Sequence, residues 1–426
     1  MKKSIYFISS PFFETIYPEQ YSIFVSINGK EKNMKQLKIA VVGLGHRGRL
    51  MVKLAKEGFD NVQVLAACDL DAELWEKQQY LVDRPMKDVL PGTKFYTSYD
   101  QLLEEHGKEL DLVMVETGAD VHAKFCIKAL EKDIAVFSDI PSVASLGEAK
   151  ALWEAEQNSK AGLMTGANPN YAGFVNTFVA LFERGLMGDP FYLECEYVGG
   201  SMAPFRDDDP ILAHSDWRRV FPAIRYCTHS LGPFLRFVKE DLRYAICLGT
   251  GSHVTPSAPA DDMQAALFQT ESGVTIRLLR SRCDGRIRAE FGHHSFRGWG
   301  TKGYFEKVDY RNSKTPSIIR FQSTEMPGTK SLTELKAEWM PEEYEGNPKA
   351  MGHGGCDYAL LADMFKALEK GKKEFPVSLR EGLRMTLPGI YAAKSAYLKG
   401  EKLTIHYPWE KEFAADVEKY DAIKEY

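Results

Sequence analysis

The chain has 426 residues, of which 44% are hydrophobic and 27% are charged, a composition typical of a globular protein with roughly two to three domains. Its formal net charge of -5 provides no basic field that would gather nucleic acid or anionic lipid. The seven cysteines are scattered and never form a C-x-x-C pair, which indicates reduced thiols and no structural zinc site. No apolar run approaches the roughly 20 residues that cross a bilayer. We therefore expect a cytoplasmic protein without nucleic-acid, membrane or metal partners.

Residues 1–36 precede the first regular element. Their basic and apolar start is similar to a secretion signal, but Ser9, Ser10 and Pro11 interrupt the apolar run and no small-x-small cleavage site follows. We predict an N-terminal extension outside the fold, with Met34 as the alternative start of translation. A signal peptide is the competing interpretation.

From Leu37 onward, short β-branched runs alternate with helical stretches, which is typical of right-handed βαβ units and a parallel sheet. The sequence predicts strands over 38–42, 62–68, 111–116 and 134–138, and helices over 49–57 and 99–106. Ser145 and Glu148 form a capping box that starts a helix running to about Gln157. Residues 37–165 are therefore predicted to form a Rossmann dinucleotide-binding domain.

After Gly162 the strands follow one another with little helix between them. The sequence predicts strands over 191–198, 243–249, 263–270, 274–282, 287–292 and 303–309, and then helices over 358–370 and 379–398. This order is typical of an open, mostly antiparallel sheet, so residues 166–408 are predicted to form a second, α+β domain, and the whole chain an α/β protein. Residues 409–426 are predicted to be a charged tail. Because an open sheet exposes apolar surface, we expect a homo-oligomer formed through this sheet.

A glycine loop lies between the first predicted strand and the first predicted helix, with the sequence Gly43-Leu44-Gly45-His46-Arg47-Gly48. Its three glycines are expected to allow a tight turn, the approach of a pyrophosphate to the backbone, and close packing of helix and strand. The phosphates would lie at the helix N-terminus, where free N–H groups favour negative charge. A glycine-rich turn without a ligand is the alternative interpretation.

Asp69 ends the second predicted strand, about 20 residues after the glycine loop, where a carboxylate accepts hydrogen bonds from the adenosine ribose. Because this carboxylate would repel a 2′-phosphate, NAD is expected rather than NADP. Arg47 argues in the other direction, since a guanidinium in the loop could meet a phosphate.

Two later segments extend the pattern: Thr117-Gly118-Ala119-Asp120-Val121-His122 follows the strand over 111–116, and Ser138-Asp139-Ile140-Pro141 follows the strand over 134–138. With the glycine loop, this order resembles the glucose–fructose oxidoreductase, inositol dehydrogenase and MocA family (the Gfo/Idh/MocA family) from Leu37 to about residue 408. The resemblance implies that NAD is lined by Gly43, Gly45, His46, Arg47, Gly48, Asp69, Thr117, His122, Asp139 and Asn168.

The chain departs from this family at two positions. The family usually has E-K-P where this chain has Asp139, Ile140 and Pro141, and isoleucine cannot replace a lysine that contacts substrate and nicotinamide. The family's sugar dehydrogenases show D-x-G-x-H where this chain has Arg225 to His229, so the histidine matches and the aspartate does not. An ordinary reversible dehydrogenase is therefore in doubt.

One branch of the family, the NAD-dependent glycosidases such as the α-N-acetylgalactosaminidases, is more similar at short motifs. It shows a T-H-x-L-G-P run, matched by residues 228–233, a G-H-G-G-x-D run, matched by residues 352–357, and a tyrosine matched by Tyr171. In that scheme a sugar hydroxyl is oxidised, a side-chain base removes the neighbouring C–H proton, and the glycosidic bond leaves by elimination. Water then adds and the hydride returns, so that NAD is unchanged overall.

The resemblance implies two catalytic residues and a set that contacts sugar. His229 suits the base at the oxidised hydroxyl because histidine titrates near neutrality, and Tyr171 suits the second base if its site lowers its pKa. Either residue is otherwise an ordinary support of its turn or core. The predicted substrate-binding residues are Trp217, Arg218, Arg225, Tyr226 and His353, for which a solvated basic rim is the alternative.

A metal site is the weaker interpretation of two further pairs, His293 with His294 and Glu194 with Glu196. Alternate glutamates on a strand share one face and fit a solvated sheet surface equally well. We expect no metal.

Three functions follow from these patterns. The first is an NAD-dependent oxidoreductase acting on a sugar or polyol hydroxyl. The second is a redox-neutral glycoside hydrolase with bound NAD. The third is a dinucleotide-binding sensor without catalysis, in which the missing lysine and aspartate mean lost activity. The sugar and its anomer are not predicted.

Overall fold

The computed structural model describes residues 35–79, 82–199, 217, 221–254, 261–281, 293–307, 316–326 and 332–423. The predicted N-terminal extension over 1–36 therefore lies outside the described residues, apart from its last two. Within the described ranges no helix combines the length and the apolar character that a membrane span requires.

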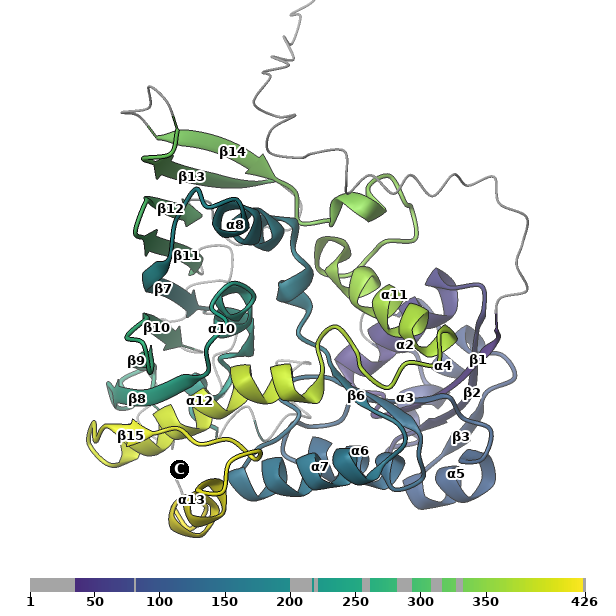
Figure 1. Ribbon diagram of the computed structural model, residues 1–426. Coiled ribbons are helices and arrows are strands. Elements are labelled where there is room, and N and C mark those ends of the chain that lie inside the picture. Colours follow the sequence, from purple (N-terminus) through teal and green to yellow (C-terminus); the bar gives the residue numbers. More distant parts are fainter. Residues whose placement is uncertain are drawn as a thin grey trace, which may run out of the picture. The chain divides into compact units, whose positions relative to one another are not determined.

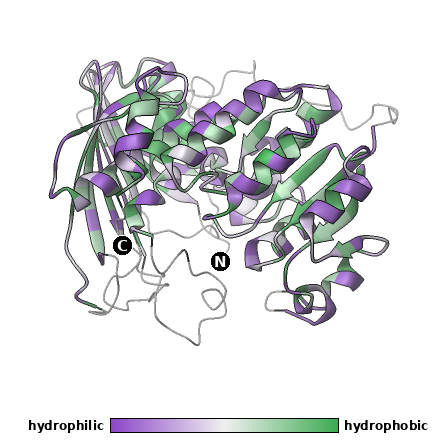
Figure 2. Cartoon of the chain, turned by 90° about the horizontal axis from the view of Figure 1, so that it is seen from below, coloured by the Kyte–Doolittle hydropathy of each residue, from purple (hydrophilic) through white to green (hydrophobic). Residues whose placement is uncertain are grey.

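The first sheet consists of six parallel strands in the order β3-β2-β1-β4-β5-β6 (Figure 1). β4 and β5 are buried at every residue, as expected for strands covered on both faces, and hydrophobic residues colour much of the strands in the interior of the chain (Figure 2). The strand order reverses between β1 and β4, where open α/β sheets bind their ligands at the carboxyl edge. The strands are β1 (Leu37–Val42), β2 (Val62–Cys68), β3 (Lys94–Tyr96), β4 (Leu112–Val115), β5 (Ala135–Ser138) and β6 (Leu163–Thr165).

The helices of this part begin close to where the sequence predicts. The Ser145 hydroxyl accepts a hydrogen bond from the Glu148 N–H (3.1 Å), while the Glu148 carboxylate accepts from the Ala144 N–H (2.6 Å), one residue before the expected partner. The predicted cap by the Ser145 side chain is thus confirmed, whereas the return bond from Glu148 goes to Ala144 instead of Ser145. The helices are α2 (His46–Gly58), α3 (Glu73–Glu76), α4 (Met86–Val89), α5 (Tyr99–His106), α6 (His122–Leu130) and α7 (Leu146–Asn158).

The second sheet has nine described strands in the order β14-β13-β12-β11-β7-β10-β9-β8-β15, and of their described pairings only β7 with β10 is parallel. The predicted open, mostly antiparallel sheet is therefore confirmed. The strand predicted over 287–292 lies outside the described residues. The strands are β7 (Pro190–Val198), β8 (Leu242–Gly249), β9 (Met263–Thr270), β10 (Thr275–Ser281), β11 (His293–Gly300), β12 (Gly303–Lys307), β13 (Ser317–Ser323), β14 (Thr333–Ala337) and β15 (Leu403–Thr404).

Helices α8 (Gly173–Glu183), α10 (Thr228–Leu235) and α12 (Leu379–Tyr397) lie on one face of the second sheet (Figure 1). Phe178 of α8 packs on Phe296 and Phe305 of the sheet, with ring centroids 5.9 and 4.7 Å away. Helix α11 (Cys356–Glu369) instead contacts α2 and β1 of the Rossmann part. An element from late in the chain therefore lies beside the glycine loop.

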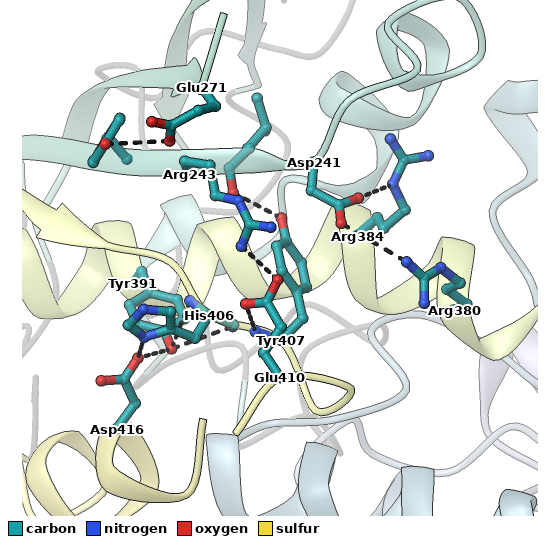
Figure 3. A network of polar contacts seen from close by, with 12 residues as sticks. Asp241, Arg243, Glu271, Arg380, Arg384, Tyr391, His406, Tyr407, Glu410 and Asp416 are labelled. Carbon is teal, nitrogen blue, oxygen red and sulfur yellow. Dashed lines mark hydrogen bonds and ion pairs between the residues drawn. The ribbon is translucent and has the colours of Figure 1, made fainter. Parts of the chain in front are cut away.

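Residues 409–426, predicted as a charged tail, include a docked helix, α13 (Phe413–Tyr420), so that prediction is wrong. Tyr391 and His406 both point at the Asp416 carboxylate (Figure 3), and their hydrogen bonds to it measure 2.5 and 2.8 Å. Phe413 and Tyr420 are buried on the same side of the helix. Phe413 and Tyr420 are seven residues, or two helical turns, apart, so they lie on one face of the helix. This spacing was overlooked because the segment as a whole is rich in charged residues.

The segment after α13 also holds the start of α7. The Asp421 carboxylate accepts hydrogen bonds from the backbone N–H groups of Leu146 (3.0 Å) and Gly147 (2.6 Å), which have no partner inside their own helix. We expect Asp421→Ala to lower the free energy of unfolding by about 1 kcal/mol, the usual value of a helix cap, in urea denaturation. The control is Glu418→Ala, an exposed change on α13. Equal stability of the two variants would contradict this role.

Candidate active site

Two glycines of the loop are required by the fold itself. Gly43 has φ +95°, and a Cβ there would lie 2.6 Å from the backbone of Glu116 and Thr117. A Cβ on Gly48 would lie 2.0 Å from the Gly43 carbonyl oxygen. These glycines let β1, β4 and α2 approach each other, which is the first and third role expected of the motif.

The fold does not require a glycine at position 45, the middle glycine of the loop. Its φ of −59° and ψ of −173° suit any residue, and no atom of another described residue lies within 4 Å of the position that its Cβ would take. It directly precedes α2, whose first turn carries no acidic side chain, so the free N–H groups of that turn favour an anion. The loop therefore fits the diphosphate of a dinucleotide, which needs close approach to the backbone at this glycine.

Asp69 is held firmly at the end of β2. One of its carboxylate oxygens accepts from the Leu44 N–H (2.7 Å) in the glycine loop and the other from the Asp71 N–H (3.1 Å). This places a fixed negative charge beside the loop. Its contact with an adenosine ribose stays a prediction, and the position of the charge favours a ligand without a 2′-phosphate.

Arg47 is bound within the protein. Its guanidinium donates two hydrogen bonds to Asp357 of α11 (2.7 and 2.8 Å), and Asp357 also accepts from Asn168 Nδ2 (2.8 Å) and His353 Nδ1 (2.8 Å). Burial alone would raise the pKa of Asp357, but Arg47 and His353 hold it well below its usual range. We call these four residues the Asp357 hub. Because the guanidinium of Arg47 is paired with carboxylates of the protein itself, Arg47 no longer argues for NADP.

The Asp357 hub was not predicted as a unit. Three of its members, Arg47, Asn168 and His353, were assigned to cofactor or substrate, and Asp357 was quoted only as the last letter of a motif. The hub joins the glycine loop, the segment after β6 and the turn before α11, so it positions all three. The sequence signal for the hub was Asp357 itself, an aspartate that ends the G-H-G-G-x-D motif directly before the helix predicted over 358–370.

Two further acidic groups lie near Arg47. Asp139 Oδ2, after β5, is 3.7 Å from Arg47 Nε. Glu116, directly after β4, is only 5% exposed, and the pKa of its carboxyl is raised well above the usual value because burial disfavours the charge and Asp139 repels it. From the sequence, Glu116 was predicted to be the last residue of a strand, without a role in the site.

His122 and Thr117 act through the backbone. The two ring nitrogens of His122 lie 2.9 Å from the Pro141 carbonyl oxygen and 2.8 Å from the Thr117 carbonyl oxygen, so His122 ties together the segments after β4 and β5. Ile140, at the family's lysine position, is 4% exposed and belongs to the core. That Thr117 and His122 line the cofactor stays a prediction. Such a role would be indirect, because His122 fixes the backbone of the two segments.

His229 lies at the start of α10 among aromatic rings. Its Nε2 is 3.2 Å from the Tyr226 hydroxyl oxygen, and its ring stacks on Tyr197 with a centroid distance of 6.1 Å. Arg280 donates from Nε to the Tyr226 carbonyl (3.2 Å) and lies 4.1 Å from the Tyr197 ring centre. The structure thus brings two predicted site residues, His229 and Tyr226, together beside a cation that sequence analysis missed.

Tyr171 is surrounded by charged side chains. Tyr171 faces Asp363 and Arg236, although its 3-10 turn (Asn168–Tyr171) packs against α10, which carries His229. Burial and the Asp363 carboxylate raise the pKa of Tyr171 well above its ordinary value. This is opposite to the shift that a catalytic base at Tyr171 would need.

The remaining predicted substrate residues bridge the two sheets. Trp217 is 8% exposed, packs on Phe221 at 6.0 Å and lies against the loop after β4. Arg225 donates to the Ala144 carbonyl (3.0 Å) and lies 4.8 Å from the Phe221 ring centre, so it is not a solvated rim. Arg218 lies outside the described residues.

The glutamates considered for a metal are paired with arginines. Glu194 lies 3.2 Å from Arg277 and 3.3 Å from Arg297, and Glu196 lies 2.9 Å from Arg277. In the part of the chain that the structure describes, no group of three or more His, Cys, Asp or Glu side chains could hold a metal ion.

Comparison with known proteins agrees with this geometry. Residues 37–167 match the model of the Gfo/Idh/MocA family, described as an oxidoreductase family with an NAD-binding Rossmann fold. A glycosyl hydrolase family 109 protein of Shewanella pealeana is 22% identical over 80% of this chain and 78% of its own length, and an alpha-N-acetylgalactosaminidase of Shewanella oneidensis matches at the same identity and coverage. The structure of an inositol dehydrogenase homolog from Azotobacter vinelandii with NADH and myo-inositol superposes with a TM-score of 0.68 at 17% identity, covering 87% of this chain and 98% of that one.

Proposed function

We propose that this chain oxidises a hydroxyl of a sugar or polyol, because residues 37–167 match the model of an oxidoreductase family with an NAD-binding Rossmann fold. The observation that carries the proposal is the unobstructed backbone at Gly45 in front of α2. When bound there, NAD supplies the hydride acceptor. Gly43, Gly45, Gly48 and Asp69 would hold it.

His229 is the proposed base for the oxidised hydroxyl. It would take the O–H proton while the hydride leaves the same carbon, which converts the alcohol to a ketone. Tyr226 supports this role because its hydroxyl orients the His229 ring at 3.2 Å, and Arg280 places a positive charge beside the pair. Trp217, Arg225 and His353 remain the proposed sugar contacts.

A redox-neutral glycoside hydrolase is the second candidate. The glycosidase relatives match about four fifths of this chain, and Ile140 replaces the lysine typical of the family's ordinary dehydrogenases. In this scheme the ketone acidifies the adjacent C–H, a second base removes that proton, and the glycosidic oxygen leaves with its electron pair. Water and the stored hydride then add back, so atoms and electrons balance without net use of NAD.

Incubation of the protein with NAD and a panel of polyols and glycosides in heavy water tests both candidates. Accumulation of NADH with a keto-sugar supports the oxidoreductase. Cleavage of glycosides at constant NAD, with deuterium entering the carbon beside the oxidised position, supports the hydrolase. Absence of both, with NAD still bound, would reject catalysis in favour of the sensor.

We propose further that the protein is cytoplasmic and a homo-oligomer through the face of the second sheet opposite α8, α10 and α12. On that face Leu267 (45% exposed) pairs with Ile246 (36%), and Leu248 (60%) lies on the same side. Glu194, Arg277 and Arg297 supply both charges beside these apolar residues, which suits a second copy of the same surface. A monomeric mass in sedimentation at micromolar concentration would reject this proposal.

A further inference from the structure

Glu116 lies at the foot of the glycine loop. Its backbone N–H donates to the Val42 carbonyl at the end of β1 (2.8 Å), which fixes the residue at the carboxyl edge of the first sheet. Its side chain starts against the first turn of α2, because a Cβ on Gly48 would lie 3.0 Å from the Glu116 Cβ. The residue thus borders the part of the chain proposed to bind the diphosphate.

The carboxyl group of Glu116 is buried without a partner. The residue is 5% exposed, and neither of its carboxyl oxygens has a hydrogen bond to any described residue. Buried polar groups in folded proteins are almost always bonded, so one that is not calls for a ligand or another explanation.

The charges around Glu116 favour its protonated form. Arg47 from α2 is the cation facing it among the described residues, and Arg47 is already held by Asp357 at 2.7 and 2.8 Å and lies 3.7 Å from Asp139. The imidazole of His353 is turned to Asp357 rather than to Glu116. Burial and Asp139 therefore raise the pKa of Glu116 well above its usual value, and Arg47 only partly opposes them.

Resting on the NAD site proposed above, we propose that Glu116 is a dinucleotide-binding residue that acts in its neutral form, donating its O–H to an oxygen of the bound NAD. A neutral carboxyl offers one donor, whereas a carboxylate offers only acceptors and would repel a diphosphate. Asp139 and Asp357, which share the guanidinium of Arg47 with Glu116, thus serve to keep that donor protonated. The glycine loop and Asp69 follow β1 and β2, whereas Glu116 follows β4, so the proposed contact comes from a third strand of the first sheet.

The proposal has a defined pH dependence. Because NAD would bind the protonated form, affinity is full below the pKa of Glu116 in the free protein. It falls as the pH rises through that value, by about tenfold for each further pH unit. Glu116→Gln keeps a donor that cannot ionise, so it should bind NAD within about threefold of the parent near neutral pH and should lack this loss. Glu116→Met has a similar size and no donor, so it should bind NAD about tenfold to a hundredfold more weakly than the parent does below the pKa of Glu116, and its affinity should not change as the pH rises through that value.

Calorimetry and infrared spectroscopy on the full chain test whether neutral Glu116 binds NAD. Calorimetric titration with NAD compares the three proteins over pH, and thermal unfolding without NAD checks that both variants fold. Infrared difference spectra follow the protonated carboxyl band of the parent, which should shift to lower frequency when NAD is added and be missing in Glu116→Gln. Equal losses in the Gln and Met variants, or a carboxyl band that NAD leaves unchanged, would overturn the role of Glu116. Failure of the parent protein to bind NAD at all would instead overturn the proposed function.

Discussion

Replacement of Gly45 by valine is expected to abolish useful NAD binding while the protein stays folded. The backbone at Gly45 has ordinary angles and its Cβ position is clear of the atoms of the other residues that the structure describes, so these residues leave room for a side chain there. A diphosphate that contacts the backbone at this point does not accept one. We expect the dissociation constant for NAD to rise at least about a hundredfold, equal to about 3 kcal/mol, in a calorimetric or NADH fluorescence titration.

The matched control is Gly43→Ala in the same loop. Its φ of +95° and the contact of 2.6 Å with the backbone of Glu116 and Thr117 mean that even one methyl group must distort the junction of β1 and β4. We expect this variant to lose about 2 kcal/mol or more in free energy of unfolding, against about 1 kcal/mol or less for Gly45→Val. If the Gly45 variant keeps its affinity, or is as unstable as the Gly43 variant, then Gly45 is not the approach point of the cofactor.

The contrast between these two glycines also marks what a sequence can predict. The spacing of the glycines, the apolar runs and the capping residue at Ser145 are local patterns, and each local pattern is decided by neighbours along the chain. They therefore predicted the positions of β1, β2, α5 and the glycine loop to within about one residue. The strand predicted over 191–198 and the helix over 379–398 agree with the structure for the same reason.

Features that depend on distant partners were not predictable in this way. Arg47 and Asp357 are separated by 310 positions, and only the packing of α11 beside α2 brings them together. The segment TELKA of β14 is largely polar and becomes a strand by pairing with β13 at the edge of the second sheet. Glu116 followed an apolar run and was counted as its last strand residue, because its burial among other charges is a property of the assembled edge.

Replacement of His229 by alanine is expected to lower the rate of hydride transfer by about a hundredfold to ten-thousandfold, the usual contribution of a general base. The residue is 6% exposed, and its described contacts are with Tyr226 and Tyr197 rather than with the glycine loop. Its loss should therefore leave the affinity for NAD unchanged. Rapid-mixing absorbance of the reduced nicotinamide, with a sugar or polyol that the heavy-water experiment identifies, measures the step directly.

Two tyrosine variants test which neighbouring side chain assists His229 and which acts as the second base. Tyr226→Phe removes only the hydroxyl 3.2 Å from His229 Nε2, so it should slow hydride transfer about tenfold through a less well oriented ring. Tyr171→Phe should leave hydride transfer intact, because the Tyr171 hydroxyl interacts with Asp363, and should reduce deuterium exchange only if Tyr171 is the second base. A His229→Ala protein with full hydride transfer would remove His229 from catalysis. A loss of exchange in Tyr226→Phe but not in Tyr171→Phe would assign the second proton transfer to the tyrosine that already touches the histidine.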